Sequence, residues 1–252
     1  IDIFHLSDEQ INILFSSRIP RTVSILLSGS SLALSGLIMQ QMMQNKFVSP
    51  TTAGTMEWAK LGILMSLLFF PNGHILIKLL FAVVLSIVGT FLFVQLINLI
   101  RVKDVIFVPL LGIMIGGILS SFTTFVALRT NALQSIGNWL TGNFAVITSG
   151  RFEVLYLTIP LLILAFVFAN HFTIAGMGKD FSHNLGVSYE KIIKIALFIT
   201  ATLTALVVVT VGTLPFLGLI VPNIISIYRG DHLKNALPHT LMLGAIFVLI
   251  AD

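Results

Sequence analysis

The sequence predicts an all-α polytopic membrane protein with about eight transmembrane helices. The composition, the mean hydropathy and the spacing of turn residues support this prediction. Apolar residues make up 56% of the 252 residues and charged residues only 10%, whereas a soluble domain carries about 25% charged residues. With a mean hydropathy of +1.03, the chain has too few polar side chains to cover a surface in water. We therefore expect it to lie in a lipid bilayer.

The predicted spans are apolar runs of roughly 20 residues bounded by charged or turn-forming residues. Ser49 and Pro50 predict an N-cap and a first helical position for the second span, and Pro238 is expected to open the last one. Pro71, Asn72 and Gly73 predict a turn. The expected ranges are 20–44, 51–70, 75–100, 105–128, 151–170, 191–212, 213–228 and 236–252.

Two connections between the spans are longer than turns. Residues 129–150 are polar and are expected to hold a short helix along the outer membrane surface. Residues 171–190 form the longest inside element, an orientation favoured by the greater number of basic residues in the inside loops. Phe181 and Leu185 lie four positions apart, which predicts a short amphipathic helix within 178–187 that ends before Gly186.

Two segments of the chain are similar to each other. Residues 35–40, Ser-Gly-Leu-Ile-Met-Gln, align with residues 217–222, Leu-Gly-Leu-Ile-Val-Pro. Each segment is a glycine-bearing apolar run followed by a short loop and a proline. Internal repeats in a very apolar chain are typical of transporters.

The absence of certain residue types and motifs from the sequence excludes several kinds of chemistry. The chain has no cysteine, which excludes disulfides, thiolate metal sites and a cysteine nucleophile. The six histidines show no metal-ligand spacing and the carboxylates show no paired arrangement, so no metal site or cofactor is expected in this chain. There is no G-x-x-x-x-G-K-[ST] loop for ATP hydrolysis. The net charge of +4 indicates basic membrane loops and no nucleic-acid partner.

Seven motifs occur in order along the chain: R-I-P-R at 18–21, S-G-L-I-M-Q at 35–40, N-K-F-V-S-P at 45–50, W-L-T-G at 139–142, G-K-D-F-S-H-N-L-G-V at 178–187, P-F-L-G-L-I-V-P-N at 215–223 and G-D-H-L-K at 230–234. With these motifs the chain resembles the FecCD family, the permease subunits of ATP-binding-cassette (ABC) importers for iron-siderophores and vitamin B12. The segments M-G-K-D-F-S at 177–182 and S-P-T-T-A-G at 49–54 are similar to the branch of that family that imports catecholate-type siderophores such as petrobactin.

The resemblance implies a ten-helix permease in the cytoplasmic (inner) membrane of a bacterium. Residues 1–252 would then form one transmembrane permease domain, with the first helix before Ile1 and the C-terminal helix or helices after Asp252. The implied partners are a second permease subunit, identical or different, and two cytoplasmic ABC ATPases that bind ATP and Mg²⁺. A siderophore-binding protein outside the membrane would deliver the ferric siderophore.

The resemblance also implies roles for residues at the two ends of the spans. Arg18 and Arg21 match arginines that contact acidic residues of the binding protein; the alternative is an anchor to lipid phosphates. Asn45 and Phe47 match the cytoplasmic gate, although Lys46 replaces the usual proline and a simple turn remains open. The segment expected to couple to the ATPase, or alternatively to be a plain amphipathic linker, contains Gly178, Phe181, Ser182, Leu185, Gly186 and Val187.

Several residues within the spans are candidates for lining the transport pathway. Glu57 and Lys60 lie three positions apart on one helical face, which suits either a pathway or a structural ion pair. The G-x-x-x-G pair in the span 105–128 favours close helix packing, although the matching family helix borders the pathway. The segment 215–222 predicts a bent or broken helix. The glycine and proline candidates are Gly112, Gly116, Gly218 and Pro222.

Two other functions remain as alternatives. An ion-coupled secondary transporter would need several buried carboxylates, and only Glu57 clearly qualifies. An intramembrane hydrolase would use Ser30 or Ser31 with His171, but the sequence lacks the G-x-S-x-G pattern of such enzymes. The leading hypothesis is a non-enzymatic permease energised by separate ATPases.

Overall fold

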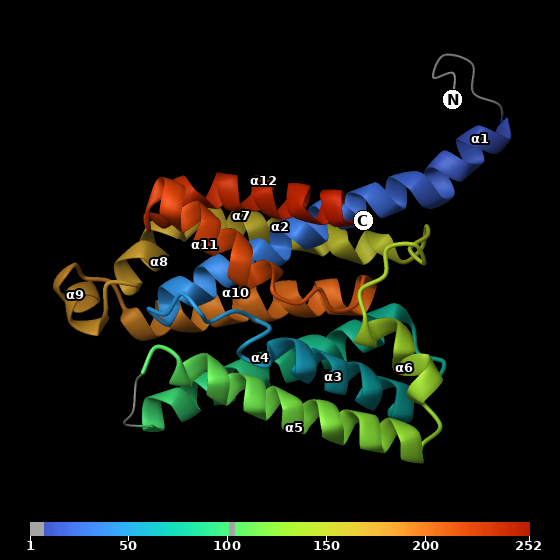
Figure 1. Ribbon diagram of the computed structural model, residues 1–252, viewed down its shortest axis with the longest axis horizontal. Helices are drawn as coiled ribbons and strands as arrows, with labels where there is room; N and C mark the ends of the chain where they lie inside the picture. The colour runs from blue at the N-terminus through green and yellow to red at the C-terminus, as the bar shows by residue number, and fades with distance from the viewer. Residues whose placement is uncertain (1–7, 101–103) are drawn as a thin grey trace.

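The computed structural model describes residues 8–100 and 104–252, and every secondary-structure element in that part is a helix. The long helices run side by side along one axis, with α9 at one end of the molecule and α1 and α6 at the other (Figure 1). The elements are α1 Asp8–Ile13, the π-helical turn η1 Leu14–Arg18, α2 Ile19–Met42, α3 Thr55–Phe69, α4 Ile75–Leu99, α5 Phe107–Arg129, α6 Leu133–Leu140, the 3-10 helix η2 Phe152–Leu157, α7 Thr158–Val167, α8 Ala169–Ala175, α9 Lys179–Asn184, α10 Tyr189–Thr210, α11 Leu217–Arg229 and α12 Leu233–Ala251.

Helices α2 and α10 form the centre of the bundle. In each, 72% of the most apolar 18-residue window is buried. The buried hydroxyls of Ser28, Ser35 and Thr204 donate to the backbone carbonyl four residues earlier, at 2.6 to 2.8 Å. Hydroxyls that bond within their own helix remain satisfied in an apolar interior.

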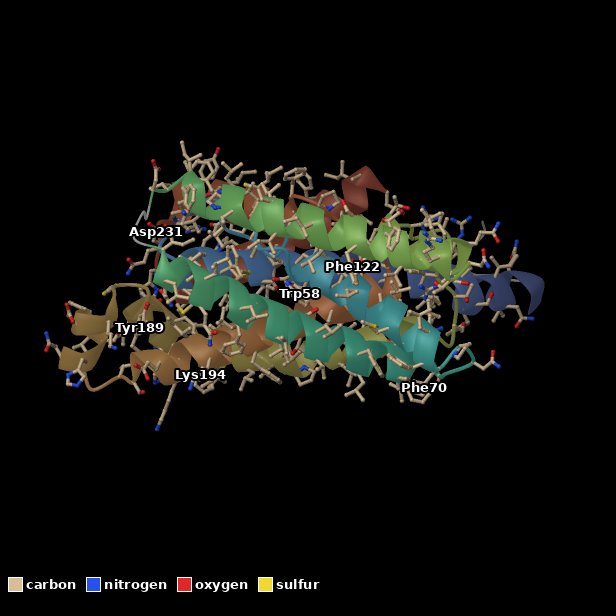
Figure 2. The ribbon with its side chains drawn as sticks, turned by 90° about the horizontal axis from the view of Figure 1, so that it is seen from below. Trp58, Phe70, Phe122, Tyr189, Lys194 and Asp231 are labelled. Atoms are coloured by element: carbon tan, nitrogen blue, oxygen red, sulfur yellow. The ribbon has the colours of Figure 1, made fainter. Side chains whose placement is uncertain are left out.

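Helices α4 and α5 lie at the periphery. Only 22% of the apolar window of each is buried, and their outer faces expose large side chains such as Val88 of α4 and Phe122 of α5. Between them lies α3, where Trp58 packs against Gly89 of α4 so closely that an added Cβ on Gly89 would lie 2.1 Å from the indole (Figure 2). Such extensive exposure of apolar side chains is expected where a helix faces lipid.

The all-helical membrane fold is confirmed, and helices occupy all eight predicted ranges. Within the described residues, five helices are long and apolar enough to cross a membrane, or six if η2–α7 and α8, bent by 59°, form one span. The helices α3 and α11 have only 15 and 13 residues. The predicted turn at 71–73 is present, as is the short helix predicted within 129–150, which is α6.

Two predicted helix starts are wrong. Ser49 and Pro50 do not open a helix: the Ser49 hydroxyl accepts a bond from the Thr52 amide, and α3 begins at Thr55 after Gly54 in the left-handed conformation. Pro238 lies inside α12, which begins five residues earlier, at Leu233. The Leu233 amide donates to the hydroxyl of Thr173 in α8 at 3.2 Å, so a contact from another helix sets this start.

The two segments that resemble each other in sequence lie against each other. Gly36 of α2 faces Gly218 of α11, where an added Cβ on Gly36 would lie 1.7 Å from the Gly218 carbonyl oxygen. A second glycine contact joins Gly29 of α2 to Gly244 of α12, where the corresponding distance is 2.5 Å. Helix α2 therefore packs backbone to backbone against both C-terminal helices.

Candidate functional site

Helix α9 presents an apolar surface at one end of the bundle. Phe181 and Leu185 are 47% and 55% exposed, as the predicted amphipathic face requires. The adjacent side of the helix is anchored, because the buried hydroxyl of Ser182 donates to the carbonyl oxygens of Gly178 at 2.8 Å and Ile174 at 3.2 Å. An exposed apolar face on an anchored helix is suited to binding a partner protein.

Glycines set the two boundaries of α9. Gly178 precedes the helix with φ +108° and Gly186 follows it with φ +71°, conformations that favour glycine. The amide of Val187 donates to the Ser182 carbonyl at 2.9 Å and closes the C-terminal turn. Ser188 takes the N-cap position of α10 without a side-chain cap hydrogen bond.

The predicted gate residues lie in the loop after α2, at the same end as α9. Asn45 is buried: its amide nitrogen donates to the Val105 carbonyl and its oxygen accepts from the Phe47 amide, both at 2.9 Å. Asn45 therefore fixes the conformation of this loop. The Phe47 side chain is 50% exposed.

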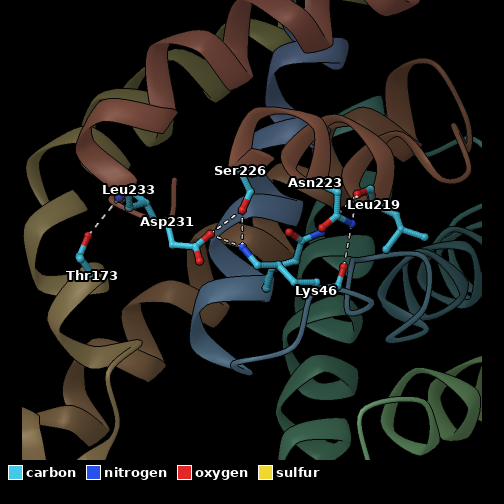
Figure 3. A network of polar contacts seen from close by, with 8 residues as sticks. Lys46, Thr173, Leu219, Asn223, Ser226, Asp231 and Leu233 are labelled. Carbon is cyan, nitrogen blue, oxygen red and sulfur yellow. Dashed lines mark hydrogen bonds and ion pairs between the residues drawn. The ribbon is translucent and has the colours of Figure 1, made fainter. Parts of the chain in front are cut away.

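A polar network that no sequence pattern predicted joins this loop to α11 (Figure 3). Lys46 forms an ion pair with Asp231 and donates to the Ser226 hydroxyl at 2.6 Å, while Ser226 donates to Asp231 at 2.5 Å. The side chain of Asn223 donates to the carbonyls of Lys46 at 2.9 Å and Leu219 at 2.8 Å. Hydrogen bonds from Lys46 and then Ser226 lower the pKa of the Asp231 carboxyl.

Glu57 and Lys60, the two charged residues of α3, form an ion pair. Lys60 Nζ lies 2.8 Å from Glu57 Oε1, with side chains 10% and 22% exposed. The other carboxylate oxygen of Glu57 is buried without a hydrogen-bond partner. Gly116 of α5 passes beside this pair, since an added Cβ there would lie 3.5 Å from Glu57 Cγ, and one on Gly112 would lie 2.0 Å from the Thr52 carbonyl oxygen. Gly112 thus allows α5 to pack closely on Thr52, whereas a Cβ at Gly116 would make an ordinary van der Waals contact.

The bent or broken helix predicted at 215–222 is instead a non-helical segment followed by the continuous helix α11. Residues 212–216 are non-helical, Phe216 has φ +62°, and α11 then includes the buried Pro222 without interruption. Pro222 has no amide hydrogen to offer the Gly218 carbonyl four residues earlier. That carbonyl instead faces Gly36 of α2.

The predicted docking arginines lie at the opposite end from α9. Arg18 is exposed at the end of η1. Arg21 forms an ion pair with Asp252, at 2.7 Å from Nη2 and 2.8 Å from Nε, with side chains 34% and 17% exposed. The pair borders a cavity of about 360 Å³ that Asn143 and Pro215 also line. The sequence analysis therefore predicted two arginines at this end of the bundle, but it did not predict the ion pair of Arg21 with Asp252.

A solved metal-chelate type ABC transporter in an inward-facing conformation matches 100% of this chain and 81% of its own chain, with a TM-score of 0.83 at 22% identity. The chain therefore shares the fold of the matched chain of that transporter. The petrobactin import system permease protein YclN of Bacillus subtilis is 54% identical over 252 residues, which are all of this chain and 80% of that protein. The petrobactin import system permease protein FatD of Bacillus anthracis is 39% identical over 97% of this chain and 73% of its own length.

The chain belongs to the FecCD transport family, whose model matches residues 2–252. The predicted resemblance is confirmed, and the protein is a multi-pass membrane permease of an ABC importer rather than an enzyme. Within residues 8–100 and 104–252, no group of three or more His, Asp or Glu side chains is placed to hold a metal ion.

Proposed function

We propose that this permease imports a ferric siderophore of the petrobactin-like catecholate class across the cytoplasmic membrane of a bacterium. The observation that carries the substrate class is the 54% identity to the petrobactin permease YclN, which extends over the whole chain. The iron travels inside its chelator as cargo, so the permease itself needs no metal ligands.

Helix α9 is the proposed contact with one of two cytoplasmic ATPases. Phe181 and Leu185 would fill an apolar groove on the ATPase, while the Ser182 hydrogen bonds to Gly178 and Ile174 transmit its movement to α8. No metal or nucleotide chemistry is assigned to this chain; ATP and Mg²⁺ would be bound by the ATPases.

At the other end, Arg18 and Arg21 would bind carboxylates of the siderophore-binding protein. Arg21 already forms an ion pair with Asp252, and both side chains are less than half exposed. A carboxylate from the binding protein would therefore have to share or displace Asp252, which makes docking at Arg21 an exchange of partners.

Between these ends, a pathway would form with a second permease subunit, identical or different. Phe47 is the proposed apolar gate at the inner end, since its exposed ring can fill a pore and exclude water. The Asn45 side chain, which accepts from the Phe47 amide, and the Lys46–Asp231 ion pair hold the two residues just before that ring. Glu57 and Lys60 are proposed to act as a structural ion pair.

The test is uptake of radioactive iron by cells that lack their own siderophore permeases and express the full-length protein with its cognate ATPase and binding protein. We expect uptake of ferric petrobactin but not of a ferric hydroxamate, and loss of uptake when ATP is depleted while the proton gradient is held. Uptake that persists without ATP would instead support an ion-coupled transporter.

A matched pair of variants tests the coupling role of α9. Phe181→Asp places a charge on the apolar face and should abolish uptake and co-purification of the ATPase. His183→Asp adds a carboxylate to the same helix about 200° around from Phe181, and should retain both. Equal activity of the two variants would contradict the proposed coupling surface.

A further inference from the structure

A cavity of about 390 Å³ lies between α4 and α10, at the end of the bundle that carries α9. Its volume is within the range of about 300 to 1,000 Å³ typical of small-molecule sites. The described transport residues do not use it, apart from the neighbouring Lys179 at the start of α9. The proposed transport function therefore does not account for this cavity.

The walls of this cavity change from apolar to polar in one direction. Phe91 and Val94 of α4 face Leu197 of α10 in the apolar part, and Val94 and Leu197 are buried. Gln95 and Asn98 continue the same face of α4 towards its end at Leu99, where both side chains are exposed.

Helix α10 shows the same change at the same end of the bundle. The apolar residues Leu197 and Ile193 line the inner part of the cavity. Tyr189, at the start of the helix, and Lys194 supply the polar groups. Figure 2 shows Tyr189 and Lys194 on the same part of α10. The cavity is thus an amphipathic slot whose polar mouth lies where two transmembrane helices end and begin.

The charge at the mouth is positive. Lys194 is exposed, and the other charged lining residues, Lys179 and Glu190, form a pair at 3.3 Å with side chains 68% and 72% exposed. The charges of Lys179 and Glu190 cancel, so the Lys194 ammonium gives the mouth its net positive charge. The Tyr189 hydroxyl and the side-chain amides of Gln95 and Asn98 are further hydrogen-bond donors. These donors suit an anionic group.

The slot lies beside a surface that faces lipid. Only 22% of the apolar window of α4 is buried, and Val88 and Leu92 are exposed on the helix face next to Phe91. An acyl chain can therefore enter the slot sideways from the bilayer. A basic mouth above an apolar slot between transmembrane helices is the arrangement that binds anionic lipid headgroups.

We infer that this slot binds one anionic phospholipid, of the phosphatidylglycerol class, from the bilayer. Its acyl chain packs on Phe91, Val94 and Leu197, and its phosphate is bound by Lys194 and Tyr189. The inference depends on the proposed function only for the side of the membrane, which would be the cytoplasmic leaflet. The bound headgroup lies beside Lys179, so lipid composition would affect the position of α9.

Native mass spectrometry of the detergent-purified full-length protein tests this, with added phosphatidylglycerol or phosphatidylcholine of the same acyl chains. We expect preferential retention of one phosphatidylglycerol. Lys194→Gln should lower that retention about fivefold, while Lys234→Gln, the same charge change on α12, should leave it unchanged. Ile193→Trp, which fills the slot, should lower retention of the anionic lipid even with Lys194 in place. Gel filtration and the unfolding temperature without lipid show whether each variant is folded.

Equal retention of the two lipids by the unaltered protein would overturn the inference, as would full retention by a folded Lys194→Gln variant. Displacement of the lipid by millimolar glycerol 1-phosphate would also overturn it, because the site would then bind a free anion. Lipid retention is measured without transport. A failure of siderophore uptake would therefore leave the lipid result standing, and a failure of lipid binding would leave the uptake result standing.

Discussion

Gly36 of α2 and Gly218 of α11 meet backbone to backbone, so that a Cβ added to Gly36 would lie 1.7 Å from the Gly218 carbonyl oxygen. That carbonyl is the one that Pro222 cannot bond within its own helix. The crossing joins the two segments that resemble each other in sequence. The close approach of α2 and α11 thus depends on the absence of a side chain at both positions.

We therefore predict that Gly36→Ala destabilises the protein by about 3 kcal/mol or more, since the methyl group can be accommodated only if two helices move apart. The unfolding temperature of the purified protein measures this. Gly117→Ala in α5 is the control, because an added Cβ there meets nothing within 4 Å. If Gly36→Ala unfolded at the same temperature as Gly117→Ala, the backbone contact between α2 and α11 would not be what stabilises their crossing.

The Glu57–Lys60 ion pair gives a second prediction. Lys60→Met leaves a largely buried carboxylate without its partner and should cost about 2 kcal/mol, less than for a fully buried pair. Adding Glu57→Gln should restore at least half of that loss, as a thermal double-mutant cycle would reveal. Unchanged stability of the single variants with loss of uptake would instead assign the pair to the pathway.

A third prediction concerns pH and the ion pair between Lys46 and Asp231. Because the pKa of the Asp231 carboxyl is lowered from its ordinary value of 3.8, the pair stabilises the folded state above that value and is lost as the pH falls through the lowered pKa. Asp231→Asn should therefore lower stability at pH 7 by about 0.5 kcal/mol, a small effect because the side chains are half exposed.

The stability difference between the unaltered protein and Asp231→Asn should be constant from pH 7 to about pH 5 and should shrink in more acidic buffer. Unfolding temperatures measured across this range provide the test. Asp180→Asn on the exposed surface of α9 is the control for the change in net charge. A difference that grew on acidification would have the wrong sign for the lowered pKa.

The partner exchange proposed at Arg21 gives a fourth prediction. Arg18→Glu combined with Arg21→Glu should weaken binding of the siderophore-binding protein about tenfold or more, measured by surface plasmon resonance on permease in nanodiscs. Asp252→Asn should have the opposite effect, because it removes the internal carboxylate that occupies Arg21. Unaltered affinity in both variants would favour the lipid-anchor interpretation of these arginines.

Local patterns in the sequence predicted local structure well. The four-residue spacing of Phe181 and Leu185 and the glycine after them were sufficient to predict α9 and its exposed face. The G-x-x-x-G pair indicated close packing, and the structure has it at Gly112. In each case the determining residues lie within a few positions of one another.

Features set by distant contacts could not be predicted in this way. The start of α12 depends on Thr173 of α8, 60 residues before Leu233, so Pro238 was a misleading signal. Lys46 and Asp231 are 185 residues apart, and no periodicity relates them. The turns at residues 49–54 pack beneath α5, which delays the start of α3 beyond Ser49. Tertiary contacts override local propensity at these positions.

The open space at Gly137 in α6 has a practical use. These 252 residues contain no cysteine, and a side chain at position 137 would meet no atom within 4 Å. A thiol introduced there by Gly137→Cys would be a unique attachment point within this part of the chain, at the end of the bundle away from α9. A membrane-impermeant maleimide added to intact cells would then report directly which way the permease faces.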